Sequence, residues 1–154
     1  MDTLDKKTSL YIDTSVFGGY YDDVFERDTR FLFSKIKENE YDVFISDLTI
    51  SELKNAPQNV KNLLKDIEYR FVEATQECKD LAEKYINEKV VGATSRDDCL
   101  HIATATINNV DILVSWNFKH IVNVERAKGY NFINFQNGLG QLVICSPKDA
   151  VLYG

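Results

Sequence analysis

The chain has 154 residues and a net charge of −6, and 44% of its residues are hydrophobic and 27% charged. These values exclude an intrinsically disordered chain and fit one folded domain. The negative charge argues against a protein that coats nucleic acid through many phosphate contacts. No apolar run approaches the roughly 18 residues of a membrane span, and the polar start does not resemble a leader peptide. We therefore expect a cytoplasmic protein that does not contact membranes.

The chain offers few soft ligands for a metal ion. It has three cysteines, none in a CxxC pair, and its only histidines are His101 and His120. This pattern favours neither a disulfide framework nor a structural zinc site. A metal ion bound here would be held mainly by oxygen atoms, which points to Mg²⁺ or Mn²⁺.

Strand-like apolar runs alternate along the chain with segments of helical spacing. The runs that predict strands lie at 10–13, 42–46, 69–75, 111–115 and 131–135, and 141–145 is a candidate sixth strand. Apolar residues at helical spacing predict helices at 27–39, 48–56, 60–67, 76–90, 96–109 and 119–129. This alternation predicts a single α/β domain over 1–154, with a mainly parallel central sheet of about five strands flanked by helices.

Carboxylate and amide side chains follow the predicted strands. Asp13 closes the first strand, Asn117 follows the fourth, and Asp98 lies in the first turn of the helix that precedes the fourth. Glu52 lies about one and a half helical turns beyond the end of the second strand. Ligands of parallel sheets bind beyond the carboxyl ends of the strands. Gathered there, Asp13, Glu52 and Asp98 would repel, so we expect raised pKa values and a divalent cation that neutralises them.

Each acid also has a simpler explanation as a helix-capping residue, which is the more frequent role for a single acid. Thr49-x-x-Glu52 and Ser95-x-x-Asp98 both fit a capping box. Asp13 fits the cap of a helix that starts at the next residue, and Asp98 fits the favourable interaction of an acid with a helix N-terminus. Only the occurrence of all three acids in one predicted place favours a metal site.

Two glycines, Gly18 and Gly19, follow the first acid. Two explanations fit them equally well. They permit a backbone with positive φ and the close approach of a phosphate chain, or they belong to an ordinary flexible loop.

Four short segments resemble, in order, the motifs of the PIN-domain nucleases, and among them the VapC-like toxins of toxin–antitoxin pairs. The segments are YIDTSVF (11–17), FISDLTISEL (44–53), DCLHIATA (98–105) and LVSWNFKHI (113–121). The closing VICSPKDAV (143–151) is similar to the usual final strand and proline of that family. The resemblance implies a three-layer α/β/α fold, an RNA substrate, a cognate antitoxin protein and a homodimer, and we place the aromatic-rich segment 25–33 near the dimer interface.

The resemblance assigns catalysis and binding of Mg²⁺ or Mn²⁺ to Asp13, Glu52 and Asp98. Many members carry an acid where this chain has Asn117, which implies a weak ligand or one that acts through water. Hydroxyl groups beside the acids are expected to support the site, and basic or aromatic side chains nearby to contact nucleic acid. The supporting residues are Thr14, Ser15 and Ser115, and the nucleic-acid contacts are Lys54, Arg96, Trp116 and Lys119.

The expected function is that of a metal-dependent endoribonuclease, a toxin component that cleaves single-stranded or looped RNA. One alternative is a catalytically degenerate RNA- or protein-binding module, which Asn117 and the negative charge favour and the three acids oppose. A second is phosphoryl transfer of the haloacid-dehalogenase type. That chemistry requires a second aspartate two residues after the first, where this chain has Ser15.

Overall fold

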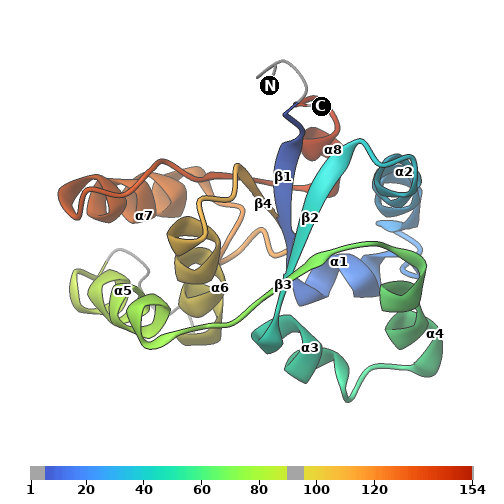
Figure 1. The fold of residues 1–154 in the computed structure, drawn as a ribbon, viewed down its shortest axis with the longest axis horizontal. Helices are drawn as coiled ribbons and strands as arrows, with labels where there is room; N and C mark the ends of the chain where they lie inside the picture. Colours follow the sequence, from blue (N-terminus) through green and yellow to red (C-terminus); the bar gives the residue numbers. More distant parts are fainter. Residues whose placement is uncertain (1–5, 90–95, 154) are drawn as a thin grey trace.

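The computed structural model describes residues 6–89 and 96–153. A five-stranded, entirely parallel sheet lies at its centre, in the order β3-β2-β1-β4-β5 (Figure 1). From β1 the chain adds β2 and β3 on one side, then crosses back and adds β4 and β5 on the other. The strands are β1 (Thr8–Ile12), β2 (Tyr41–Ser46), β3 (Arg70–Val72), β4 (Ile112–Val114) and β5 (Val143–Cys145).

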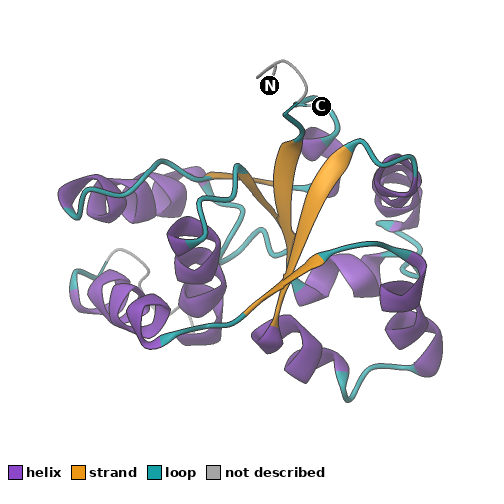
Figure 2. Ribbon diagram, in the orientation of Figure 1, coloured by secondary structure: helices purple, strands orange, loops and turns teal. Residues whose placement is uncertain are grey.

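Helices cover both faces of this sheet, which confirms the predicted α/β architecture (Figures 1 and 2). One face carries α1 (Thr14–Gly19), α2 (Glu26–Lys37), α3 (Asp47–Leu53), α4 (Gln58–Lys61), the 3₁₀ helix η2 (Asn62–Asp66) and α8 (Pro147–Ala150). The other face carries α5 (Gln76–Asn87), α6 (Arg96–Ile107) and α7 (Val124–Gln136). None of the helices in the described part of the chain is both long and apolar enough to cross a bilayer.

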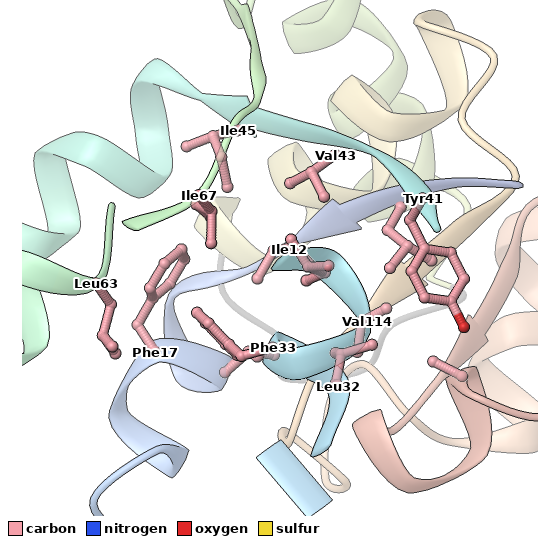
Figure 3. Close-up of a cluster of buried hydrophobic side chains, with 14 of the residues drawn as sticks. Ile12, Phe17, Leu32, Phe33, Tyr41, Val43, Ile45, Leu63, Ile67 and Val114 are labelled. Carbon is pink, nitrogen blue, oxygen red and sulfur yellow. The ribbon is translucent and has the colours of Figure 1, made fainter. Parts of the chain in front are cut away.

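Two hydrophobic cores, one on each face, follow from the alternation of side chains along the strands. In β1, Leu10 and Ile12 belong to the core under α1 and α2, whereas Tyr11 belongs to the core under α5 and α6. In β4, Val114 and Leu113 divide in the same way. Figure 3 shows the first core, in which Ile12 and Val114 lie among side chains from the covering helices. Burial on both faces explains why these strands are nearly continuous apolar runs.

The predicted strand at 131–135 is wrong, because these residues form the second half of α7. Tyr130 and Ile133 are buried while Phe132 and Phe135 are exposed, a spacing of three that suits a helix. The run Asn-Phe-Ile-Asn-Phe resembled a strand because the solvent side of this helix carries large apolar residues, so that no polar face marks the helix. The fifth strand is instead β5, which lies within the candidate sixth strand at 141–145.

Two predicted helices also differ from the structure. The helix expected at 119–129 begins only at Val124, where Asn123 caps α7 by accepting a hydrogen bond from the backbone N–H of Arg126. The helix expected at 60–67 is divided between α4 and η2. The other predicted helices are present with slightly shifted ends.

Candidate active site

The candidate site lies at the carboxyl ends of β1, β2 and β4, where the strand order reverses between β1 and β4. Two of these strands pass into a helix without any loop: Asp13 is the cap of α1 and Ser46 is the cap of α3. Because parallel strands end at one edge of the sheet, this arrangement fixes the polar residues after the strands close to one another. Crevices at such a reversal are the usual ligand sites of parallel sheets.

Asp13 is a buried carboxylate, with only 4% of its surface exposed. Its Oδ1 accepts hydrogen bonds from the backbone N–H of Ser15 at 3.1 Å and from the Ser15 hydroxyl at 2.6 Å. Its Oδ2 accepts a hydrogen bond from the Ser115 hydroxyl at 2.7 Å. Burial raises the pKa of Asp13 above its ordinary value and the nearby charge of Asp98 adds to this, whereas His101 and the two serines oppose it.

Glu52, on α3, is held by two donors from other elements. Its Oε1 accepts a hydrogen bond from the Thr14 hydroxyl of α1 and lies 2.9 Å from Nε2 of His101. It is not the acid of a capping box, because α3 is capped by Ser46, whose hydroxyl accepts from the N–H of Thr49. Burial alone would raise the pKa of Glu52, but the hydrogen bond and charge of His101 and the bond from Thr14 lower it. Glu52 is therefore a charged acceptor at neutral pH.

A buried chain of hydrogen bonds lies behind Glu52. His101 Nδ1 is 2.6 Å from the hydroxyl of Tyr11, which is 2.7 Å from the hydroxyl of Ser46. Because Glu52 is an acceptor, Nε2 of His101 carries a proton. Nδ1 accepts from Tyr11 when the ring is neutral and donates to the Tyr11 oxygen when the ring is charged. Burial raises the pKa of Tyr11 and keeps it protonated, as this role requires. Neither His101 nor Tyr11 was assigned to the site from the sequence, although a tyrosine within a buried strand needs a partner for its hydroxyl.

Asp98 occupies the first turn of α6, as predicted, and is half-buried. Ser95, the other residue of its predicted capping box, lies outside the described residues. Asp98 is near enough for its charge to raise the pKa of Asp13. The expectation of a raised carboxylate pKa is confirmed in direction for Asp13, but burial is the largest cause and the expected repulsion, from Asp98, is the smallest. The expectation is wrong for Glu52, because His101 and Thr14 stabilise the charged form of that side chain.

The segment after β4, which begins at Ser115, contacts Asp13 through a further hydrogen bond. The Ser115 hydroxyl accepts a hydrogen bond from the N–H of Asn117 at 2.9 Å while it donates to Asp13. Asn117 Oδ1 in turn accepts from the N–H of His120 at 2.9 Å and so stabilises the turn that follows. The three predicted supporting hydroxyls therefore each donate to one of the acids, Ser15 and Ser115 to Asp13 and Thr14 to Glu52.

Gly19 is required by packing and not by a positive φ. Both predicted glycines lie in α1, where the backbone is helical. A Cβ on Gly19 would lie 2.6 Å from Nε1 of Trp116, whereas a Cβ on Gly18 would meet nothing within 4 Å. Trp116 is packed, because Nε1 donates to the Thr29 hydroxyl at 2.8 Å and the ring stacks on Phe25.

The basic residues predicted to contact nucleic acid differ in their surroundings. Arg96, at the start of α6, forms an ion pair with Glu83 of α5. Lys54 is exposed at the end of α3, and Lys119 is exposed in the turn after β4. Contact of these side chains with nucleic acid stays a prediction.

The donors at the site suit a hard divalent cation, because Asp13, Glu52 and Asp98 offer carboxylate oxygens and no soft ligand. Burial and the charge of Asp98 raise the pKa of Asp13, and a positive charge nearby would lower it again by stabilising the charged carboxylate. Within residues 6–89 and 96–153, however, no three acidic, histidine or cysteine side chains are arranged to hold a metal ion. The chemistry of the donors therefore fits a cation, whereas Glu52 is turned toward His101 and Thr14.

Comparison of the fold with solved structures finds proteins of similar architecture. VapBC2 from Rickettsia felis, bound to a promoter DNA fragment, matches with a TM-score of 0.57 and 13% identity, over 90% of this chain and 98% of that chain. The chain has the fold of a VapC toxin. VapC20 of Mycobacterium tuberculosis, which cleaves the sarcin-ricin loop, matches with a TM-score of 0.55 and 13% identity, over 70% of this chain and 89% of that one.

FitAcB from Neisseria gonorrhoeae also has this fold, with a TM-score of 0.57 and 15% identity, over 90% of this chain and 97% of that chain. No protein-family model and no curated protein matches the sequence. The VapC-like fold is thus shared although few residues are identical.

Proposed function

We propose that the protein is a metal-dependent endoribonuclease and the toxin component of a toxin–antitoxin pair. The observation that supports this most strongly is the buried Asp13 carboxylate at the reversal point of a VapC-like sheet, with the charge of Asp98 close by. Adjacent hydroxyls of α1 hold two of the acids, since Ser15 donates to Asp13 and Thr14 to Glu52. A helix cap alone needs no second acid held in this way.

In this proposal, Asp13, Glu52 and Asp98 hold Mg²⁺ or Mn²⁺. A bound ion would supply charge stabilisation at the scissile phosphate and a lower pKa for the water molecule that attacks it. The chain's own groups prepare the ligands. Ser15 and Ser115 fix both oxygens of Asp13, and His101 keeps Glu52 charged and oriented. Glu52 and Asp98 are only half-buried, which leaves their carboxylates room to turn toward an ion.

The test is cleavage of a looped RNA with Mg²⁺ or Mn²⁺, compared with EDTA. We expect Asp98→Asn to abolish cleavage while circular dichroism stays native, because the variant removes one ligand charge without removing an apolar contact. Asp97→Asn is the matched control, since Asp97 is an exposed acid in the same turn of α6. Undiminished cleavage by Asp98→Asn would contradict the proposal.

A degenerate binding module remains a second candidate, favoured by the way Glu52 is tied to His101 and by Asn117 at the fourth motif. It predicts that the parent protein binds RNA or a protein partner but cleaves nothing with any divalent ion. The EDTA comparison therefore separates the two candidates with one preparation.

We further propose that the partner is a small DNA-binding antitoxin and that the pair acts in the cytoplasm. The support is the neighbour VapBC2, which is bound to DNA from its own promoter. Co-expression with the protein encoded beside this chain, followed by size-exclusion chromatography, tests this. A complex that shifts promoter DNA is the expected result, and separate elution of the two proteins would contradict it.

A further inference from the structure

An aromatic cluster lies beside the candidate site and is not used by the proposed chemistry. It consists of Phe25, which precedes α2, and of Trp116 and Phe118, which follow β4. Phe25 and Trp116 are stacked, with ring centroids 4.2 Å apart and an interplanar angle of 22°. Phe118 meets Trp116 edge-on, with centroids 5.9 Å apart, and lies tilted at 6.4 Å from Phe25. The three rings form one continuous aromatic surface.

Trp116 is the member of this cluster that its neighbours fix in place. The indole N–H of Trp116 donates to Thr29, and Gly19 leaves no space between α1 and the ring. The backbone N–H of Trp116 donates to the Ser15 hydroxyl at 2.9 Å. Because these contacts hold the Trp116 ring, Trp116 gives the neighbouring Phe118 ring a fixed support.

Phe118 itself is 50% exposed, although a phenylalanine that only fills a core would be buried. Its neighbour Asn117 is tied by its N–H to Ser115, and Ser115 donates to Asp13. The exposed ring is therefore three residues from the hydroxyl that holds the candidate catalytic acid. A nucleotide whose phosphate reached Asp13 would carry its base into this neighbourhood.

We propose that Phe118, supported by Trp116 and Phe25, is a stacking subsite for an unpaired nucleobase next to the scissile phosphate. The inference rests on the proposed function, since it assigns a substrate contact to that same site. A flat, half-exposed ring that packs against a fixed neighbour suits a base, because every base has a π-face. It also selects for single-stranded or looped substrate, whose bases are free to unstack.

Trp116 makes this proposal directly measurable, because it is the only tryptophan in the protein. Its fluorescence is followed while single-stranded RNA of about eight nucleotides is added in Ca²⁺ buffer, a length within the usual range for such sites. An abasic oligonucleotide with the same backbone is the matched ligand control. We expect quenching by the base-bearing strand and much weaker binding of the abasic strand.

Three variants complete the test. Phe118→Leu keeps an apolar side chain and removes the π-face, so we expect about tenfold weaker binding of the base-bearing strand and no change for the abasic strand. Phe118→Tyr keeps the ring and should bind like the parent. Phe135→Leu removes an exposed ring from α7 and should also bind like the parent.

Equal affinity of Phe118→Leu and the parent, or equal affinity for both strands, would overturn the subsite. If Phe118→Leu binds RNA like the parent but no longer binds the antitoxin that the parent binds, the ring belongs to a surface for a protein partner instead. Because the titration involves no cleavage, base-dependent binding without nuclease activity would refute the proposed function and leave the subsite standing.

Discussion

Replacing Asp13 by asparagine removes a buried negative charge and preserves the shape of the side chain. Asparagine caps helices as well as aspartate does, so Oδ1 can still accept from Ser15. At the position of Oδ2 an amide N–H then faces the hydroxyl of Ser115, which can accept as well as donate. The variant thus keeps the hydrogen bonds and tests the charge alone. Asp13→Ala, by contrast, removes the cap and leaves donors on both serines without an acceptor.

The sign of the effect follows from the raised pKa of Asp13, caused first by burial. A carboxyl group with a higher pKa in the folded state binds protons more readily when folded. Its contribution to stability is therefore lost as pH rises from the unfolded value of about 3.9 through the folded value. One pKa unit corresponds to about 1.4 kcal/mol. In EDTA at about pH 8 we expect Asp13→Asn to equal the parent or exceed it by about 1 kcal/mol, with a gap that closes toward pH 4.

Urea unfolding of the parent and both variants, across this pH range and with either EDTA or Mn²⁺, measures these differences. Asp13→Ala should be less stable than the parent by about 0.5–2 kcal/mol, the usual cost of a lost cap. Saturating Mn²⁺ should reverse the order of parent and Asp13→Asn, because only the parent gains the full binding free energy. Equal destabilisation of Asp13→Asn in EDTA and in Mn²⁺, independent of pH, would make Asp13 a structural cap and refute the metal-site reasoning.

Two further outcomes are expected. Asn117→Asp keeps an acceptor for the N–H of His120 and adds a negative charge near the acids. Calorimetry should therefore show tighter Mn²⁺ binding by this variant than by the parent. Equal or weaker affinity would place Asn117 outside the metal shell. The protein should be a dimer by light scattering at micromolar concentration, and Phe31→Asp should dissociate it, since Phe31 is the half-exposed phenylalanine of segment 25–33; a monomeric parent would contradict this.

The sheet was predictable because its central strands β1 and β4 are buried on both faces. The residues 10–12 and 112–114 are apolar throughout, and the intervening helical spacing leaves a parallel arrangement as the simplest solution. The sequence also placed Asp13 correctly, since it depends only on the end of β1. The helix at 124–136 was not predictable by the same rule, because Phe132 and Phe135 face solvent and conceal the helical period.

The contacts within the candidate site were less predictable than its members. The bond between Ser115 and Asp13 joins residues 102 positions apart, and that between His101 and Glu52 joins residues 49 apart. Such pairs depend on the strand order, which periodicity does not determine. A local rule also offered a capping box as the alternative role of Glu52, because Thr49 matched the pattern, whereas Ser46, three residues earlier at the end of β2, is the cap.

Capping and metal binding were posed as alternatives for Asp13, yet the structure makes them compatible. The helix cap uses Oδ1, through Ser15, and Ser115 holds Oδ2, so both oxygens are oriented by donors that stabilise the charged form. Each oxygen has further lone pairs beyond those bonds. Burial makes the remaining charge costly, which is the condition under which an added cation gains most. The capping bonds would therefore serve to hold a charged carboxylate rigidly at the reversal point of the sheet, where a freely turning side chain would lose affinity for an ion.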